Sequence, residues 1–421
     1  MKGIEEKQIE APYELPEGWK WCRLGEVADW GSGGTPSRKN PEYYQGSIPW
    51  IKTGELNETY IFDSEEKVSE DAIKHSSAKI FPKETVVMAM YGATIGKTAI
   101  FGIDASTNQA CACAICHKEL DNHFLFNFLK SKKDYFLYNA KGGAQPNISQ
   151  EIIKNTLIPL PPTLADQQRI VNRIESMFAK LDEAKEKAQN VIDGFETRKA
   201  AILHKAFTGE LTAKWRKENG VSDDSWEEKT IGEISSKITD GEHSTPKRVD
   251  QFCGYYLLSA RNIHNGEIRL DDVDFVTENE YERIRKRCNP NKNDILISCS
   301  GSIGRVCVIQ DNNKYVMVRS AAMVKLLQDN PFYIAYMLQS FNVQQQIEKT
   351  KKQSCQANLF LGAIKQLSLP VPALPEQVEI VRILDIIIEK ENKAKQAAEA
   401  VLEQIDLLKK SILARAFRGE L

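Results

Sequence analysis

Apolar side chains recur at helical spacing in two long stretches of the chain. In residues 164–211, and again in residues 374–421, they step by four and three along the sequence. This spacing, held over about five heptads, predicts a coiled coil. Arg198 and Glu391 interrupt the apolar seam, so each must reach solvent or meet a partner. The predicted seam residues are Ile170, Ile174, Leu181, Val191, Phe195, Ile380, Leu384, Ile387, Val401 and Ile405.

These two stretches are copies of each other. AAILHKAFTGEL (200–211) matches KSILARAFRGEL (410–421), and LADQQRIV (164–171) matches LPEQVEIV (374–381). Both matches have an offset of 210 residues, with no insertion or deletion between them. A repeat of this length means that the chain contains the same structural unit twice.

The match continues upstream more loosely. GWKWCRLGEV (18–27) aligns with SWEEKTIGEI (225–234), and PKETVVMAMYGATIG (82–96) aligns with PNKNDILISCSGSIG (290–304). Pro-rich segments end each variable part before the helix begins. The predicted domains are a first variable domain (1–163), a central helix (164–211), a second variable domain (212–373) and a C-terminal helix (374–421).

Two helices of equal length in one chain most simply pair with each other. A helix of roughly 40 residues is about 60 Å long, whereas a domain of about 150 residues has a radius of gyration near 15 Å. A parallel pair would force the second domain to bridge the whole rod, so an antiparallel pair is favoured. The predicted fold class is α+β, with two similar globular domains separated by an antiparallel coiled coil and related by a pseudo-two-fold axis. In the alternative, each helix packs separately on its own domain.

The segment YGATIGKT (91–98) is close to a phosphate-binding P-loop. That motif reads G-x-x-x-x-G-K-[ST], but only three residues separate Gly92 from Gly96. The second copy reads SGSIGRV, with Arg305 in place of Lys97. The repeated feature is therefore a tight turn between two apolar strands, followed by one basic side chain.

Two further motifs have simpler structural interpretations. Cys111, Cys113, Cys116 and His117 contain the haem-attachment spacing C-x-x-C-H, but the small apolar run ACACAI favours a buried strand. No second ligand pair follows at zinc-site spacing. DNPF (329–332) differs by one residue from the D-P-P-F form of an amino-methyltransferase motif, but its counterpart in the repeat is DNHF (121–124). Both segments open amphipathic stretches and are typical helix starts.

Composition narrows the class of protein. The chain has 421 residues, 42% of them hydrophobic, and a net charge of −2. This excludes a uniformly basic nucleic-acid binder but allows local basic patches. The sequence begins without an apolar signal region and contains no stretch long enough to cross a bilayer, so we expect a cytoplasmic protein that makes no contact with membranes. An odd number of scattered cysteines fits reduced thiols.

Two similar but non-identical domains at a fixed separation suit double-stranded DNA, whose half-sites repeat about every 34 Å on one face. Bases are read by Arg, Lys, Asn, Gln and Ser/Thr, while backbone N–H groups hold phosphates. Polar and basic loops of this kind recur in both domains. The candidate DNA-contact residues are Gly33, Gly34, Thr35, Ser37, Arg38, Lys39, Lys97, Lys141, Gln145 and Asn147 in the first domain, and His243, Ser244, Thr245, Lys247, Arg248, Arg261, Asn262, Arg305, Lys352, Gln353, Gln356 and Asn358 in the second.

The order of the motifs resembles a known family. LPEGW…LGEV, GGTPS, YYQGSIPW, the GATIGK and GSIGR turns, and LPPTLADQQRIV and VPALPEQVEIV leading into GEL-terminated helices are similar to the DNA specificity (S) subunit of Type I restriction-modification systems. The resemblance implies that each target-recognition domain reads half of a bipartite sequence. It also implies that the helices set the spacer and dock two modification (M) subunits, which bring S-adenosylmethionine, while restriction (R) subunits bring ATP-dependent cleavage.

The chain lacks a complete S-adenosylmethionine or N-P-P-[YF] motif, a full P-loop and the Pro-Asp dipeptide of the usual restriction-nuclease signature. We therefore expect no catalytic residue, no metal and no cofactor of its own. Two alternatives stay open. A nucleotide-hydrolysing enzyme would lose ATP binding in a Lys97→Ala variant. A protein–protein adaptor that binds peptides would lack salt-dependent binding to duplex DNA.

Overall fold

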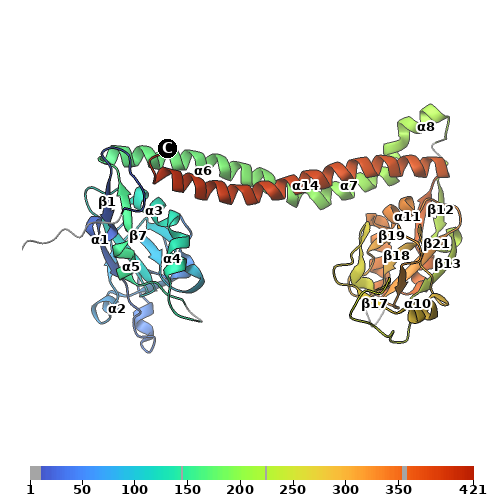
Figure 1. Ribbon diagram of the computed structural model, residues 1–421, viewed down its shortest axis with the longest axis horizontal. Coiled ribbons are helices and arrows are strands. Elements are labelled where there is room, and N and C mark those ends of the chain that lie inside the picture. The colour runs from blue at the N-terminus through green and yellow to red at the C-terminus, as the bar shows by residue number, and fades with distance from the viewer. Residues whose placement is uncertain (1–10, 144–145, 223–224, 353–357) are drawn as a thin grey trace, which may run out of the picture. The chain divides into compact units, whose positions relative to one another are not determined.

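The computed structural model describes residues 11–143, 146–222, 225–352 and 358–421 (Figure 1). Contacts divide the chain into two compact units. Unit 1 contains Met1–Gln189 and Glu399–Leu421, and unit 2 contains Asn190–Ala398. We refer to the globular part of unit 1 before residue 164 as the first head, and to residues 225–373 of unit 2 as the second head.

The first head contains two main sheets. The five-stranded sheet has the order β2 (Ala28–Ser32), β10 (Cys111–Cys116), β7 (Val86–Ala89), β8 (Thr98–Phe101) and β4 (Tyr60–Ile61). The four-stranded sheet has the order β5 (Glu66–Val68), β3 (Ile48–Ile51), β9 (Ala105–Thr107) and β6 (Ile80–Phe81). A further pair joins β1 (Lys20–Arg23) to β11 (Leu157–Leu160). The helices are α1 (Leu24–Val27), α2 (Glu70–Lys74), α3 (Asn122–Ser131), α4 (Lys133–Asn139) and α5 (Gln150–Asn155).

The second head repeats this plan. Its four-stranded sheet has the order β13 (Ser235–Asp240), β21 (Ala321–Leu326), β18 (Ile295–Ser298) and β19 (Val306–Val308). The three-stranded sheet has the order β17 (Asp274–Val276), β14 (Tyr255–Leu258) and β20 (Tyr315–Met317). Two short pairs are β12 (Glu227–Thr230) with β22 (Ser368–Val371), and β15 (Ile263–His264) with β16 (Glu267–Ile268). The helices are α9 (Ile231–Ile234), α10 (Glu278–Arg285), α11 (Pro331–Leu338), α12 (Phe341–Lys352) and α13 (Leu361–Gln366).

The strand orders of the two heads correspond except for β4 and β6 of the first head, which have no counterpart in the described sheets of the second. The order β2-β10-β7-β8 recurs as β13-β21-β18-β19, and β5-β3-β9 recurs as β17-β14-β20. The same neighbours are parallel in both smaller sheets, namely β3 with β9 and β14 with β20. The prediction of two similar α+β domains is confirmed.

The long helices pair in opposite directions within each unit. They are α6 (Leu164–Asp193), α7 (Phe195–Phe207) and α14 (Leu374–Ala416). In unit 1, Asp182 of α6 forms an ion pair with Lys409 of α14, while Phe417, just beyond α14, shares a core with Ile170 and Ile174 near the start of α6. Because residues later in α6 meet residues earlier in α14, the two segments are antiparallel.

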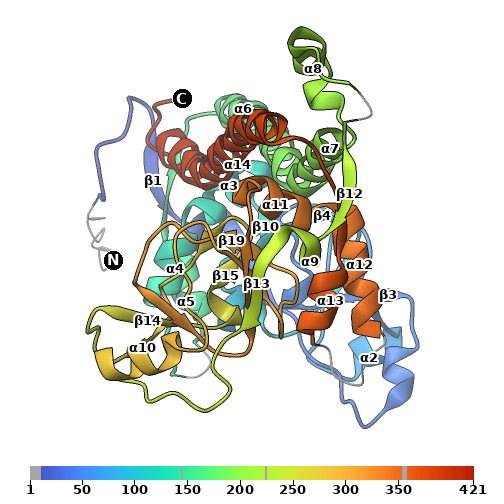
Figure 2. The same cartoon turned by 90° about the vertical axis from the view of Figure 1, so that its right-hand side faces the viewer.

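Unit 2 shows the same antiparallel pattern between α7 and the first part of α14. The Arg198 Nε atom lies 2.7 Å from the Glu391 Oε2 atom, so the two charges that interrupt the seam meet each other. Arg216 of the short helix α8 (Ala213–Asn219) pairs with Glu376 near the start of α14. Figure 2 shows α7 and α14 side by side, with α11 beneath them.

The predicted seam needs one correction. Ile170, Ile174, Phe195, Ile380, Leu384 and Ile405 are buried, and Leu181, Val191 and Ile387 are half-buried. Val401, however, is 38% exposed, and Leu402 lies half-buried in its place. The least exposed positions in this part of α14 are Ala398, Leu402 and Ile405, which step by four and then three. The assignment of Val401 reversed these steps, which places the residue on the outer side of the helix.

The helices also end earlier than the repeat suggests. The regular helix is interrupted at Gly194, and α7 ends at Phe207 rather than residue 211. Gly209 has φ +79°, a left-handed conformation that favours glycine and closes the helix. The Gly-Glu-Leu (GEL) segments at 209–211 and 419–421 therefore follow the ends of the long helices and are not part of them.

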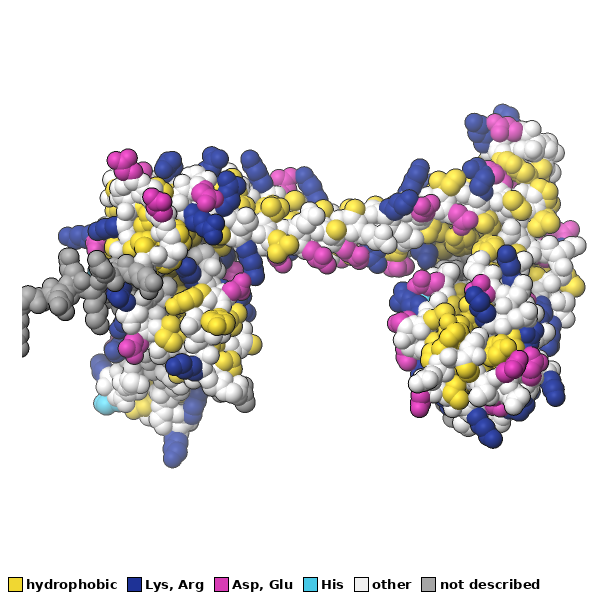
Figure 3. All heavy atoms as spheres, viewed as in Figure 1, with side chains coloured by type: hydrophobic (Ala, Val, Ile, Leu, Met, Phe, Trp, Pro, Cys, Tyr) yellow, Lys and Arg dark blue, Asp and Glu magenta, His cyan; other side chains and the backbone are white. Residues whose placement is uncertain are grey.

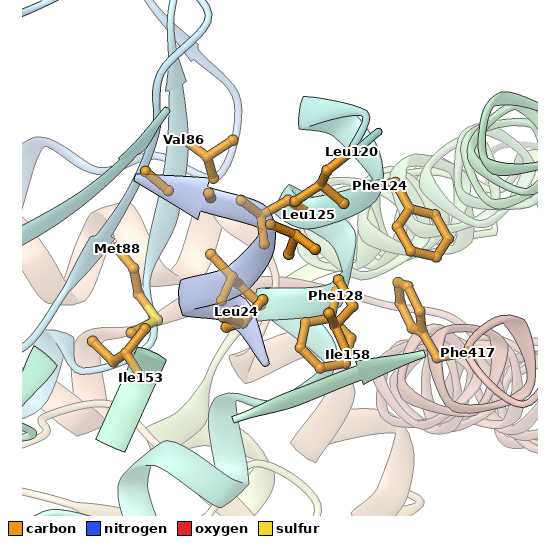
Figure 4. Close-up of a cluster of buried hydrophobic side chains, with 14 of the residues drawn as sticks. Leu24, Val86, Met88, Leu120, Phe124, Leu125, Phe128, Ile153, Ile158 and Phe417 are labelled. Atoms are coloured by element: carbon orange, nitrogen blue, oxygen red, sulfur yellow. The ribbon is translucent and has the colours of Figure 1, made fainter. Parts of the chain in front are cut away.

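The core of the first head joins the five-stranded sheet to both long helices (Figure 4). Phe124 and Phe128 of α3 point toward Phe417, with ring centroids 5.1 and 5.2 Å from it. Leu24 and Ile158 fill the space beneath them. The end of α14 is thus part of the core of the first head.

Three local predictions are confirmed. Cys111–Cys116 form β10, whose first four residues are buried. Residues 90–97 form a turn between the buried strands β7 and β8, with Gly92 at φ +60° and Gly96 at φ +80°. Asp121 and Asn330 accept backbone hydrogen bonds at the starts of α3 and α11.

Candidate nucleic-acid interface

The predicted contact loops of the first head gather at one edge of the five-stranded sheet. β2 ends at Ser32 and β7 ends at Ala89, whereas β10 begins at Cys111. Ser32 pairs with Ala112, and Ala89 pairs with Cys111, so these three strand ends lie level with one another. The loops that follow β2 and β7 and precede β10 therefore share this edge.

Backbone hydrogen bonds join these loops. Gly34 N donates to Thr107 O at 2.9 Å, and Gly92 N donates to Pro146 O at 2.8 Å. Lys141 and Asn147 exchange two backbone bonds of 2.8 Å. The structure thus brings the loop 31–40, the turn that contains Lys97, and the loop 141–147 together on one surface.

Gly33 and Gly34 serve packing at this edge. Both are buried, and a Cβ atom on Gly33 would lie 1.9 Å from the Thr107 carbonyl oxygen. On Gly34 it would lie 2.2 Å from the Ser77 hydroxyl. The exposed side chains of the loop are Thr35, Ser37, Arg38 and Lys39.

Arg38 is held in place by two kinds of contact. Its Nη1 atom lies 2.6 Å from the Glu66 Oε2 atom, and its guanidinium lies 4.0 Å from the centre of the Tyr44 ring. The hydrogen bond from Arg38 lowers the pKa of Glu66. An arginine positioned in this way loses little conformational freedom when its outer face meets a ligand.

The second head presents the same edge. β13 ends at Asp240, β18 ends at Ser298, and β21 begins at Ala321, which pairs with Ser298. A hollow of about 590 Å³ opens at these strand ends. Its lining includes Asp240, His243, Cys299, Ser300, Arg319, Ser320, Asn358 and Phe360.

A charged cluster stands at one side of this hollow. His243 Nε2 lies 2.7 Å from Asp240 Oδ2, and Arg287 Nη2 donates to Asp240 Oδ1 at 2.7 Å. Burial raises the pKa of Asp240, but the hydrogen bonds from Arg287 and His243 outweigh it, and the net change is a decrease. The carboxylate is therefore ionised at neutral pH and holds the side chains of Arg287 and His243 in place.

The other candidates of the second head lie on loops near this edge. Arg248 and Arg261 both form ion pairs with Asp274, at 2.9 and 3.0 Å. The next residue before Arg261, Ala260, donates its backbone N–H to the Ser320 hydroxyl at 3.0 Å, which brings this loop to the hollow. Ser244, Thr245 and Lys247 are exposed, and Arg305 is half-buried in the turn after β18.

Asn262 has a different role from the one predicted. Its side chain is 2% exposed, and its amide donates to the carbonyl oxygens of Arg269 and Asp272. Its Oδ1 atom accepts the backbone N–H of Ser259. These bonds use the amide to shape the loop, so the side chain is closed to DNA. Gln145, Gln353 and Gln356 lie outside the described residues, as does the side chain of Lys352.

Two exposed residues at these edges escaped the sequence analysis. Gln109 accepts a hydrogen bond from the Thr35 hydroxyl at 2.5 Å, and Arg319 lines the hollow of the second head. Gln109 follows the short buried strand β9, and Arg319 follows the short buried strand β20. Both lie outside the Gly-rich loops from which the candidate DNA contacts were predicted. The matched segment that precedes Gln109, residues 82–96, has an offset of 208 from its copy at 290–304, so the sequence repeat alone did not pair Gln109 with Arg319.

Charge on the heads is mixed. In the view of Figure 3, Lys and Arg side chains are scattered over both heads and alternate with Asp and Glu. Among the described residues, no group of three or more His, Cys, Asp or Glu side chains is placed to hold a metal ion. In the same part of the chain, no helix is long and apolar enough to cross a membrane.

Comparisons with known proteins agree with this architecture. The family model described as Type I restriction modification DNA specificity domain matches residues 16–193 and 223–404. The Type I restriction enzyme EcoBI specificity subunit of Escherichia coli is 24% identical, over 74% of this chain and 68% of its own length. The Type I restriction enzyme EcoKI specificity subunit of Escherichia coli strain K12 is 25% identical, over 97% of this chain and 90% of its own.

A solved structure has the same fold. Its title concerns complex assembly and conformational transition of the type I R-M system. It superposes with a TM-score of 0.72 at 20% sequence identity, and the match covers 97% of this chain and 100% of that chain. The likeness extends over both heads and the long helices.

Proposed function

Because the chain belongs to the family of Type I restriction modification DNA specificity domains, we propose that it recognises a bipartite, asymmetric sequence in double-stranded DNA. It does so as the specificity subunit of a Type I restriction-modification complex. Each head reads one half-site. The long helices set the spacer and dock two methyltransferase (M) subunits, and restriction (R) subunits join the assembly.

The observation that carries this proposal is the equivalence of the two sheet edges. Both heads gather polar and basic loops at the ends of matching strands, on scaffolds of the same strand order. The loops share a Thr-Pro pair and two basic residues, but other side chains differ, with Ser37 in the first head where the second has Lys247, and His243 in the second head alone. Similar scaffolds that carry different side chains suit two half-sites of different sequence.

The chain has no chemistry of its own in this proposal. The methyltransferase subunits supply S-adenosylmethionine and flip the target adenine out of the duplex. We propose that the DNA contacts are made by two sets of residues, one on each head. The first-head residues are Thr35, Ser37, Arg38, Lys39, Lys97, Lys141, Gln145 and Asn147, and the second-head residues are His243, Ser244, Thr245, Lys247, Arg248, Arg261, Arg305, Lys352, Gln353, Gln356 and Asn358.

Co-expression with the partner methyltransferase subunit tests this proposal. We expect methylated adenines to map to a split motif with a fixed gap, and the motif to vanish when this chain is omitted. A stable complex without any motif would contradict sequence-specific reading. The absence of a complex would favour the adaptor alternative, and ATP binding that Lys97→Ala abolishes would favour the nucleotide-hydrolysing enzyme.

A further inference from the structure

The loop that joins β9 to β10 in the first head follows the same path as the loop that joins β20 to β21 in the second. In the first head it runs from Thr107 to Cys111, and in the second from Met317 to Ala321. Met90 N donates to Ala110 O at 2.8 Å, and Cys299 N donates to Ser320 O at 2.8 Å. These matched bonds fix the register of the two connections at the sheet edge.

A second matched contact supports the same register. Gly34 N donates to Thr107 O at 2.9 Å in the first head. Glu242 N donates to Met317 O at 2.7 Å in the second head. Counting forward from either bond places Gln109 and Arg319 at the same position. They are thus the equivalent side chains of the two reading edges.

Arg319 is exposed and lines the hollow of the second head. Within the described part of the chain its guanidinium makes no ion pair. Arg248, Arg261 and Arg287 in the same head each pair with an aspartate. Among the described residues that line this hollow, Arg319 is therefore an arginine whose hydrogen-bonding fork is open to a ligand.

Gln109 is exposed at the corresponding point of the first head. Its Oε1 atom accepts the Thr35 hydroxyl at 2.5 Å, which orients the amide. This bond uses one lone pair of Oε1. The second lone pair and the amide N–H groups are the donor and acceptor pair that matches the major-groove edge of adenine.

Resting on the proposed function, we propose that Gln109 and Arg319 are specificity-determining residues of the two half-sites. Gln109 reads an adenine through its N6 and N7 atoms, and Arg319 reads a guanine through its O6 and N7 atoms. These are the bidentate pairings that glutamine and arginine side chains make in the major groove. The two heads thus use one structural position to read two different bases.

The test uses the full chain in complex with its methyltransferase subunits. The complex selects duplexes from a library in which both half-sites are randomised, at one fixed salt concentration. For Arg319→Ala we expect roughly 10- to 100-fold loss of the preference for guanine at one position of the second half-site. For Gln109→Ala we expect a loss of similar size for adenine at one position of the first half-site.

Each variant carries its own control, because the other half-site and the spacer must stay unchanged. This result also shows that the variant complex is folded. Uniformly weaker binding with both half-sites intact would mean that the residue contacts phosphate, and would overturn the inference. The Arg319→Gln variant gives a second readout, since it should exchange guanine for adenine at the same position.

Failure of the inference differs from failure of the proposed function. If the wild-type complex selects no bipartite motif, the proposed function fails. If the wild-type motif is clear and the variants leave it unchanged, only the assignment of Gln109 and Arg319 fails.

Discussion

The Nη1 atom of Arg216 lies 2.8 Å from the Oε1 atom of Glu376, and their side chains are only 8% and 1% exposed. The same carboxylate accepts the Thr212 hydroxyl at 2.7 Å and the Trp226 indole N–H at 3.1 Å. Glu376 stands near the start of α14, and Arg216 belongs to α8. One buried carboxylate therefore fastens the helix to the segment that leads into the second head.

Removing this charge should destabilise unit 2. Glu376→Gln removes the negative charge from the buried ion pair with Arg216, and breaking a buried pair typically costs about 3–5 kcal/mol of unfolding free energy. Denaturant unfolding of the purified chain measures the loss. Glu379→Gln is the matched control on the same helix, because Glu379 pairs with the exposed Arg382 and should contribute less than about 1 kcal/mol. Equal effects from the two substitutions would contradict the role of Glu376.

The end of α14 should be equally important to unit 1. Phe417 is 3% exposed and packs edge-on against Phe124 and Phe128. Phe417→Ala should cost about 3–5 kcal/mol, because it removes buried surface and leaves a cavity. Thermal unfolding compares it with Phe62→Ala in the same unit, where the ring is 66% exposed and the expected change is within about 0.5 kcal/mol. If Phe417→Ala behaved like Phe62→Ala, the docking of this end would be energetically unimportant.

Acid should weaken the second head through Glu280. Its carboxylate accepts two bonds from Arg283 and one from the backbone of Lys247, and the bond from Arg283 is the largest cause that lowers its pKa, to about 2. In an unfolded chain the carboxyl group of glutamate has a pKa of about 4.3. Because the folded pKa is the lower one, the stabilisation is complete above about pH 4.3 and declines as the pH falls toward 2.

The comparison of Glu280→Gln with the wild type isolates this contribution. The variant lacks the titrating group, so its unfolding free energy should fall less steeply between about pH 4.5 and 2. Glu282→Gln replaces an exposed carboxylate of the same helix and should keep the wild-type slope. Parallel pH profiles for wild type and Glu280→Gln would disprove the assignment.

Sequence periodicity and the internal repeat were sufficient to predict the two similar domains and the paired long helices. Apolar steps of four and three located both long helices. Their equal length favoured pairing, and the small size of the second domain favoured the antiparallel direction that the contacts of Arg198 with Glu391 and of Arg216 with Glu376 show within unit 2. The error at Val401 arose because alanines on several faces of α14 leave the order of the steps ambiguous by one residue. Only contacts with the partner helix decide between Val401 and Leu402.

Residue type alone predicted the DNA-contact residues less well than periodicity predicted the helices. Asn262 has the chemistry of a base reader, but its amide bonds to Ser259, Arg269 and Asp272, which are spread along one loop. Gln109 gained interest only when the fold placed it beside Thr35, far away in the sequence. Exposure and hydrogen-bond partners depend on tertiary structure, which a single sequence does not reveal.

The long helices should control the spacing of the two half-sites and nothing else. Deleting one heptad from residues 170–195 shortens the segment between the heads by about two helical turns, or roughly 10 Å. It preserves the heptad register, so the seam residues on either side of the deletion still face the partner helix. Mapping of methylated adenines should therefore reveal both original half-sites separated by a different spacer. A deletion of three residues is the informative control, since it breaks the register and should lower stability as well. Should the seven-residue deletion leave the spacer unchanged, the helices would not measure the distance between half-sites, and that distance would have to be set by the partner subunits.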